Sequence, residues 1–335
     1  MSKVRFGVLS TAKIGTAKVI PAMQRGARTT IAAIASRDLK RAQEAASSLG
    51  IPTAYGSYEA LIDDPSIDAV YIPLPNHLHL YWTTRAANAG KHVLCEKPLG
   101  FTEGDVMAYI ETRDRTRVKI QEAFMVRTHP QWLRAREMVR AGRLGRRLGM
   151  IGAFSYYNAD PLNIRNIAAY GGGALFDIGC YFVMTARFIF GREPTRVMAL
   201  MDRDPEFETD RLTSMVLDFG GATFVGTCAT QMTPFQRIQI LGSEARLEVE
   251  IPFNAPPDRA CKLFFDARGV LGGSSVETIE IEACDQYTIQ GDRFAEAIQE
   301  GLPEVYPLEE SLANFRVIDA LFRSAQDGNW VTVTE

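Results

Sequence analysis

The amino-acid sequence predicts an α/β protein in which a Rossmann-type, doubly wound parallel sheet precedes an α+β domain with a large, mostly antiparallel open sheet. Up to residue 125, short apolar runs alternate with helical stretches, which is typical of parallel strands joined by crossover helices. Beyond residue 125, strand-like runs follow one another through glycine turns such as Gly220-Gly221, which is typical of antiparallel neighbours. With 335 residues the chain is long for one core. We therefore expect two domains, 1–125 and 126–335.

In the first domain, strands are expected at the apolar runs and helices between them. The expected strands are 4–9, 30–35, 68–73, 92–95 and 118–124. The expected helices are 16–26, 39–49, 57–62, a stretch ending at 89, and 102–112.

In the second domain, a helix is expected to end near residue 141 and a strongly apolar helix to cover 174–190. The expected strands are 149–157, 194–201, 212–219, 222–229, 235–241, 245–251 and 276–282. Two carboxyl-terminal helices, 291–300 and 308–326, are expected to pack back onto the first domain.

Composition argues against several classes of partner. The net charge is −3 and charges of both signs are interspersed, so neither nucleic acid nor a membrane surface is expected as a partner. Five well-separated cysteines indicate reduced thiols rather than a disulfide framework. Without a targeting segment or a continuous apolar run of about twenty residues, we expect a soluble, cytoplasmic protein. One His-x-His pair, His77 and His79, is too little for a metal site, and none is expected.

The apolar run 92–95 is followed by Glu96-Lys97-Pro98. Because proline cannot continue a central strand, Lys97 is expected at the carboxyl edge of the sheet, where open α/β sheets bind their ligands. An ammonium group beside such a crevice can exchange a proton with a substrate oxygen. The alternative is that Lys97 merely pairs with Glu96.

Small residues at Ser10, Ala12 and Gly15 have the spacing of the dinucleotide fingerprint G-x-G-x-x-G. Since serine and alanine replace the first two glycines, the turn is expected to avoid positive φ at both positions. The amino terminus of the following helix would bind phosphate. The alternative is an ordinary turn between a strand and a helix.

The second expected strand ends in Ser36-Arg37-Asp38, near the position that reads the adenosine ribose. A guanidinium suits a 2′-phosphate, so NADP is favoured; if Asp38 is the ribose ligand instead, NAD is possible. Asn76 follows another strand and can bond a ribose or carboxamide. The residues expected to contact the cofactor are Ser10, Thr11, Ala12, Lys13, Ile14, Ser36, Arg37, Pro73, Leu74, Asn76, His79, Glu96 and Lys97.

Three glycines, 171–173, lead into the apolar helix and are expected to let the backbone approach a ligand. Asp177 and Tyr181 lie four residues apart on one face of that helix and need polar partners if buried. Lys97 is a candidate partner, because an ammonium favours the phenolate. The alternative is a structural Asp–Tyr pair.

Together the segments GVLSTAKIG, EKP at 96–98, VRTHP at 126–130 and GGGALFDIGCY at 171–181 resemble the glucose–fructose oxidoreductase / inositol dehydrogenase (Gfo/Idh/MocA) family over nearly the whole chain. Tyrosine at 181, where many members have histidine, resembles the subgroup with dimeric dihydrodiol dehydrogenase and NADP-dependent D-xylose dehydrogenase. The resemblance implies that Lys97 and Tyr181 flank the reacting carbon and that Asp177 positions them or the substrate. It also implies a homo-oligomer, dimer or tetramer, formed through the open sheet. The residues expected to bind substrate are Lys97, Arg127, His129, Asn163, Arg165, Asp177 and Tyr181.

The hypothesis from the sequence is hydride transfer between NADP and a hydroxyl or carbonyl carbon of a sugar or polyol. Tyr181 would exchange the proton, and Lys97 would lower the pKa of the phenol and bind the same oxygen. One alternative is a reductase of a keto sugar or anhydro-keto sugar. An alternative of another class is a non-catalytic, NADP-sensing regulator.

Overall fold

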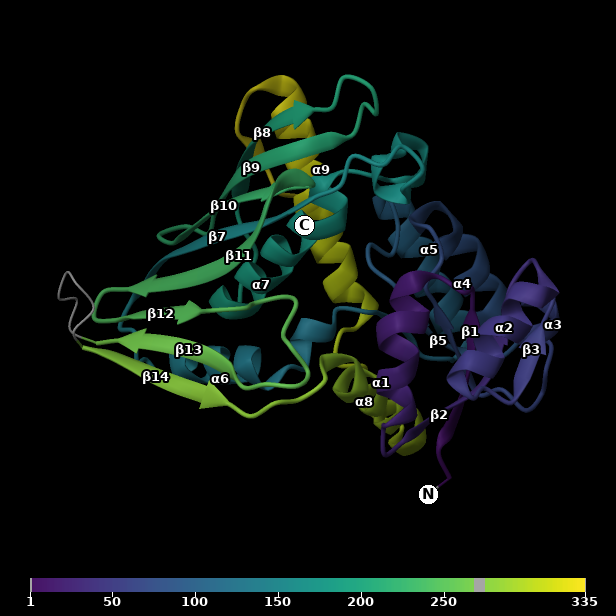
Figure 1. Ribbon diagram of the computed structural model, residues 1–335. Helices are drawn as coiled ribbons and strands as arrows, with labels where there is room; N and C mark the ends of the chain where they lie inside the picture. Colours follow the sequence, from purple (N-terminus) through teal and green to yellow (C-terminus); the bar gives the residue numbers. More distant parts are fainter. Residues whose placement is uncertain (1, 268–274, 335) are drawn as a thin grey trace. The chain divides into compact units, whose positions relative to one another are not determined.

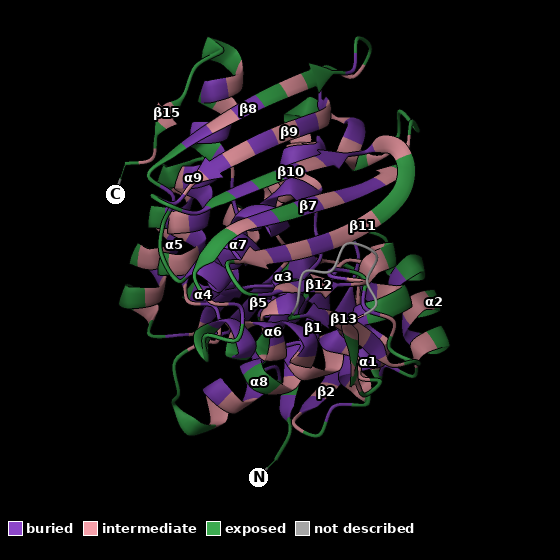
Figure 2. Ribbon diagram, turned by 90° about the vertical axis from the view of Figure 1, so that its left-hand side faces the viewer, coloured by how far each residue is buried: buried purple, intermediate pink, exposed green. Residues whose placement is uncertain are grey.

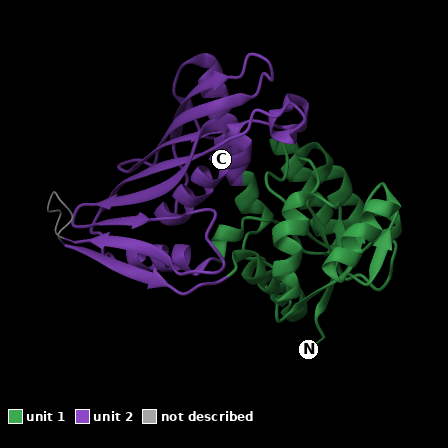
Figure 3. Cartoon of the chain, in the orientation of Figure 1, with its two compact units in different colours: residues 1–128, 285–312 green, residues 129–284, 313–335 purple. Residues whose placement is uncertain are grey.

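The computed structural model describes residues 2–267 and 275–334. Within these residues, the strands form a six-stranded sheet of order β3-β2-β1-β4-β5-β6 and a nine-stranded sheet of order β14-β13-β12-β11-β7-β10-β9-β8-β15 (Figure 1). The chain divides into two compact units (Figure 3). Unit 1 comprises Met1–Thr128 and Asp285–Leu312, and unit 2 comprises His129–Cys284 and Ala313–Glu335.

The sheet of unit 1 is parallel throughout its paired strands, as predicted. Its strands are β1 (Val4–Leu9), β2 (Thr29–Ala35), β3 (Thr53–Tyr55), β4 (Ala69–Ile72), β5 (His92–Cys95) and β6 (Ile120–Glu122). The strand order changes direction between β1 and β4, and ligands bind outside the carboxyl ends of parallel strands at such a switch point.

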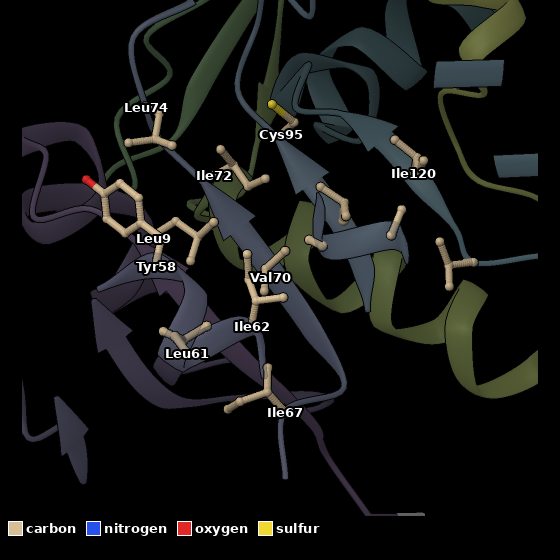
Figure 4. Close-up of a cluster of buried hydrophobic side chains, with 14 of the residues drawn as sticks. Leu9, Tyr58, Leu61, Ile62, Ile67, Val70, Ile72, Leu74, Cys95 and Ile120 are labelled. Atoms are coloured by element: carbon tan, nitrogen blue, oxygen red, sulfur yellow. The ribbon is translucent and has the colours of Figure 1, made fainter. Parts of the chain in front are cut away.

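Helices cover both faces of this sheet. One face packs on α1 (Ile20–Gln24), α2 (Leu39–Leu49) and α8 (Gln286–Glu300), and the other on α3 (Tyr58–Ile62), α4 (His79–Asn88) and α5 (Glu103–Thr116). Figure 4 shows the second of these cores, in which Val70 of β4 lies beside Ile62. Burying each such side chain contributes roughly 1.5–3 kcal/mol, so the sheet is a rigid support for its edge residues.

The sheet of unit 2 is mixed: β7 and β10 pair in parallel, and the other paired neighbours are antiparallel. Its strands are β7 (Arg147–Tyr157), β8 (Arg196–Arg203), β9 (Asp210–Asp218), β10 (Thr223–Ala229), β11 (Gln231–Gly242), β12 (Arg246–Val249), β13 (Cys261–Asp266), β14 (Val276–Ile281) and β15 (Val331–Thr332). This confirms the predicted, mostly antiparallel second sheet.

One face of the mixed sheet carries α6 (Pro130–Arg140), α7 (Cys180–Phe190) and most of α9 (Leu308–Asp327). The opposite face is open, with exposed and buried residues alternating along its strands (Figure 2). Ile151 of β7 and Val225 of β10 are paired on this face and are 48% and 46% exposed.

Several elements differ from the expectation. The helix after β1 begins at residue 13 and contains a π-helical turn, η1 (Gly15–Val19), before α1. Strands β3, β13 and β15 were not predicted. Two of these have only two or three residues, which is too few for a periodic pattern. Helix α8 starts at Gln286 because Asp285 caps it, accepting a hydrogen bond from the Tyr287 amide.

The stretch Ala168–Phe190 is long and apolar enough to cross a membrane, although 89% of its most apolar window is buried inside the protein. This burial identifies it as a core helix of unit 2.

Candidate active site

Lys97 lies two residues beyond β5, at the carboxyl edge of the parallel sheet, and its bond to Pro98 is cis. Buried side chains hold the backbone that follows it. The Leu99 amide donates to Glu122 Oε1 at 2.9 Å, and the Leu99 carbonyl accepts from the Tyr109 hydroxyl at 2.7 Å. The turn that carries Lys97 is therefore anchored to both β6 and α5.

His79 holds the same turn. Its ring is fully buried, with Nδ1 2.9 Å from the Pro98 carbonyl oxygen and Nε2 2.8 Å from the Leu74 carbonyl oxygen. Burial lowers the pKa of His79 to about 4. Because both ring nitrogens contact backbone, the ring braces two loops at the sheet edge. The expected contact of His79 with the cofactor stays a prediction.

Glu96 accepts a hydrogen bond from the Tyr71 hydroxyl at 2.7 Å, and its amide donates to the Ile72 carbonyl. Burial and the adjacent Glu96 carboxylate raise the pKa of Tyr71 well above its usual value, so the phenol stays a hydrogen-bond donor. The carboxylate is thus tied to β4 next to the switch point.

The loop after β1 departs from the expectation at one residue. Ser10 has φ of +122°, although it is not glycine, and its side-chain oxygen accepts the Ala12 amide at 2.9 Å. The hydroxyl thus stabilises locally a backbone conformation that glycine would adopt without strain. The expectation that this turn avoids positive φ is wrong at Ser10.

The residues of this loop fit a dinucleotide. A helix begins at Lys13, so the first-turn N–H groups lack acceptors within the helix and are available to bind a phosphate. Gly15 packs close to the loop after β4, since a Cβ there would lie 3.4 Å from Pro73 Cγ. Thr11 and Leu74 belong to the same two loops, Ile14 lies in the first turn of the helix, and Asn76 begins the short 3-10 helix η2 (Asn76–Leu78).

The end of β2 carries the residues expected at the adenosine ribose. Arg37 is exposed, and its positive charge opposes the rise that burial causes in the pKa of the Tyr58 hydroxyl. Asp38 caps α2: its Oδ1 accepts the amides of Lys40 at 2.9 Å and Arg41 at 3.4 Å. Asp38 therefore already has a structural function, whereas Ser36 and Arg37 lie before the cap.

In unit 2, Asp177 is the centre of a polar cluster. Its Oδ2 accepts from Arg165 Nε at 2.9 Å and from the Tyr156 hydroxyl at 2.6 Å. Burial, and next the Asp177 carboxylate, raise the pKa of Tyr156. Asn163 accepts the Arg165 amide and so shapes the turn that presents the guanidinium. The structure thus brings together three of the predicted substrate-binding residues, Asn163, Arg165 and Asp177.

Two of the glycines before this helix lie close to other parts of the protein, and the expected approach of this backbone to a ligand stays a prediction. A Cβ at Gly172 would lie 2.4 Å from the Arg165 carbonyl oxygen. Gly173 has φ of +115°, and a Cβ there would lie 1.9 Å from Asp210 Oδ1. Asp210, on β9, accepts the Leu175 amide at 2.7 Å and therefore holds the first turn of the helix.

Tyr181 is buried at the start of α7, and its ring packs against Phe253 and Phe154, with centroids 5.2 and 6.2 Å away. A π-helical turn, Leu175–Gly179, contains Asp177 and precedes Tyr181. The two residues therefore do not have the regular α-helical spacing of positions i and i+4. Tyr156 and Arg165 are polar partners of Asp177, and the structural Asp177–Tyr181 pair stays an alternative.

Two other predicted substrate ligands have structural contacts. His129 is fully buried; its Nδ1 accepts the Gln131 amide at 3.2 Å and its Nε2 lies 3.4 Å from Cys284 Sγ. The ring thus caps α6, and the expected contact of His129 with substrate stays a prediction. Arg127 lies over the Tyr306 ring, 5.2 Å from its centroid, within unit 1.

Comparison with known proteins decides the family. Residues 4–124 match the model described as "Oxidoreductase family, NAD-binding Rossmann fold", and residues 132–248 match the GFO/IDH/MocA C-terminal domain. The chain belongs to the Gfo/Idh/MocA family. It is thus an NAD(P)-dependent oxidoreductase, and the resemblance inferred from the sequence is confirmed.

Relatives within the Gfo/Idh/MocA family are similar over almost their full length. The chain is 46% identical to an uncharacterized oxidoreductase, ORF334, of Rhizobium meliloti, covering 99% of this chain and 100% of the relative. It is 41% identical to D-xylose 1-dehydrogenase (NADP(+)) 2 of Haloferax volcanii, covering 96% and 98%. The solved structure of KijD10, a 3-ketoreductase from Actinomadura kijaniata in complex with NADP and TDP-benzene, superposes with a TM-score of 0.89 at 28% identity, covering 96% and 98%.

Sequence reasoning missed four polar residues of this Gfo/Idh/MocA protein: Glu122, Tyr71, Tyr156 and Asp210. Glu122 was detectable, because it ends the strand next to the one that precedes Lys97. Tyr156 is 21 residues from its partner Asp177, and no local pattern links them.

In residues 2–267 and 275–334, no group of three or more histidine, cysteine, aspartate or glutamate side chains is arranged to hold a metal ion.

Proposed function

We propose that the protein oxidises a hydroxyl-bearing carbon of a sugar or polyol with NADP, in the manner of an aldose 1-dehydrogenase or a dihydrodiol dehydrogenase. The observation that carries this is Lys97, held at the carboxyl edge of a dinucleotide-binding sheet by Glu122, Tyr109 and His79. The 41% identity to a protein named D-xylose 1-dehydrogenase (NADP(+)) supports an aldose as substrate.

The chain's own residues would move the proton. NADP, when bound, accepts the hydride. Tyr181 accepts the hydroxyl proton, and the Lys97 ammonium binds the same oxygen and favours the phenolate. Asp177, held by Arg165 and Tyr156, orients the neighbouring substrate hydroxyls together with Asn163. In this proposal unit 1 binds the dinucleotide and unit 2 the substrate.

NADP is preferred over NAD in this proposal because of the groups at the end of β2. Arg37 provides a guanidinium with two donors for a 2′-phosphate, and Ser36 provides a hydroxyl. Asp38, the residue that would bind a bare ribose diol, is engaged in capping α2. The remaining predicted contacts, at residues 10–14, 73–76 and 96–97, belong to the same proposed cofactor site.

A second candidate is the reverse reaction on a keto sugar. It is favoured by the 3-ketoreductase, whose structure matches this chain over nearly its full length. Hydride transfer between a carbinol and a ketone uses the same two proton-handling residues in either direction.

We further propose a homo-oligomer, dimer or tetramer, in the cytoplasm. A second copy on the open face of the mixed sheet would bury Ile151, Val225 and Leu200. The cysteines of the described residues are unbridged, which suits a reducing compartment. Sedimentation velocity tests the assembly: a monomer at micromolar concentration overturns it.

The proposed function is tested by following NADP reduction over aldoses, inositols and dihydrodiols, with NAD in parallel. At least one aldose should be oxidised. Lys97→Ala should lose roughly 10²–10⁴-fold in kcat, as expected for removal of an acid–base group, while NADPH still binds with its fluorescence change. Full turnover by Lys97→Ala would contradict the mechanism, and a screen without turnover in either direction would contradict the function.

A further inference from the structure

A buried carboxylate lies next to Lys97 in unit 1. Glu122 is the last residue of β6, and its Cα is paired with that of Cys95, two residues before Lys97. The residue is 4% exposed. An ionised carboxylate in that position is costly unless hydrogen bonds and an opposite charge compensate it.

Two interactions of Glu122 concern the turn that carries Lys97. One oxygen accepts the Leu99 amide at 2.9 Å, and the Lys97 ammonium acts on the carboxylate as an opposite charge. The Leu99 carbonyl and the Pro98 carbonyl are held separately, by the Tyr109 hydroxyl and by His79. Hydrogen bonds to neutral groups would suffice to fix this backbone. A carboxylate adds a charge that faces the ammonium.

We infer that Glu122 is a positioning residue for the reaction: it holds the Lys97 turn through the Leu99 amide and orients the Lys97 ammonium through its negative charge. This inference rests on the proposed function, because it concerns the lysine placed there in proton transfer.

The carboxyl group can change its charge in the neutral range. Burial raises the pKa of Glu122 to about 7, while the Ser311 hydroxyl, the Leu99 amide and Lys97 oppose the rise and Glu96 adds to it. The other titratable groups that interact with it are Cys95 of β5 and Tyr109 of α5, whose pKa values burial raises well above the usual range. Protonating Glu122 removes the charge that faces Lys97, so turnover should increase with pH through about 7.

The test is the pH profile of kcat for wild type and Glu122→Gln, from pH 5 to 9. The amide retains an acceptor for Leu99 but carries no charge. We expect kcat to fall about tenfold at pH 8 and the transition near pH 7 to disappear, with NADPH binding retained. Tyr109→Phe is the matched control, because it loosens the same turn without removing charge and should keep the transition.

The wild-type profile keeps the inference testable if Glu122→Gln does not fold. A wild-type kcat that shows no transition near pH 7 overturns the inference.

Two variants distinguish failure of the inference about Glu122 from failure of the proposed function. An inactive Lys97→Ala combined with a wild-type pH profile in Glu122→Gln overturns the inference about Glu122 alone. A fully active Lys97→Ala overturns the proposed function itself.

Discussion

Each unit contains a buried carboxylate that accepts a backbone amide, but the two carboxylates are expected to have different effects. In unit 1, the buried carboxylate of Glu122 accepts the Leu99 amide beside Lys97; in unit 2, the buried carboxylate of Asp210 accepts the Leu175 amide before Asp177. Burial raises the pKa of both, to about 7 and about 6.

The surroundings of these carboxylates differ. Glu122 faces the ammonium of Lys97, whereas Asp210 is held by the Thr213 hydroxyl at 2.7 Å and lies against Gly173. A carboxylate next to a reactive cation can change the reactivity of that cation. A carboxylate that contacts a hydroxyl and a glycine instead stabilises the local backbone conformation. The comparison thus separates a group expected to affect turnover from one expected to affect folding.

Gly173→Ala should have the largest effect on the free energy of unfolding, because the new side chain would clash with Asp210 in unit 2. The new Cβ would lie 1.9 Å from Asp210 Oδ1 at a φ of +115°. We expect a loss of about 3 kcal/mol or more in the free energy of unfolding, measured by urea denaturation.

Gly191→Ala provides the control for that clash, because Gly191 has φ of +67° and nothing within 4 Å of the new Cβ. It should cost about 1 kcal/mol. If both variants lose the same free energy of unfolding, glycine is required at position 173 because of its backbone conformation and not because of the contact with Asp210.

The second-largest effect should be on the pH dependence of the free energy of unfolding, which distinguishes Glu122 from Asp210. A pKa raised on folding means that stability is lost as pH rises through the folded value. As pH rises from 4.5 to about 7, the wild type should lose the stability that protonated Glu122 provides, whereas Glu122→Gln should not. For Asp210→Asn the same difference should develop between pH 3.8 and about 6. We expect about 1–3 kcal/mol for each, from urea midpoints between pH 4 and 8. Differences that do not change with pH would show that the carboxyl groups are not titrating there.

Arg37→Ser should have the smallest effect and test the cofactor end of unit 1. Losing the guanidinium should lower the ratio of kcat/KM for NADP to that for NAD about tenfold, equivalent to ~1.4 kcal/mol. Unfolding free energy should change little, since Arg37 is exposed. The variant should be compared with Lys40→Ser, which removes a nearby exposed charge after the Asp38 cap; an equal decrease in both would indicate general electrostatics rather than recognition by Arg37.

The fold was predictable because alternation between buried strands and amphipathic helices is a local property. Strand β1 and helix α2 were found with their correct bounds. The π-helical turns at Gly15–Val19 and Leu175–Gly179 were not, since an inserted residue follows from packing and leaves the apolar pattern nearly unchanged.

The candidate site was predictable where its chemistry is local in sequence and less so where it depends on partners. Lys97 was placed at the sheet edge by the proline that follows it. The positive φ of Ser10 was missed because its own hydroxyl stabilises it. Partners of Asp177 come from 12 and 21 residues away, and the burial of His79 and His129 depends on loops distant in sequence.

The discontinuity of unit 1 limits how relatives can be recombined. Phe294 of α8 packs on Phe6 of β1 with ring centroids 6.3 Å apart, and Asp292 accepts the amides of Ala27 and Arg28. A chimera that takes residues 1–128 from one family member and the remainder from another would therefore mismatch its own core. Exchanging cofactor preference between relatives as a module requires transplanting residues 285–312 as well.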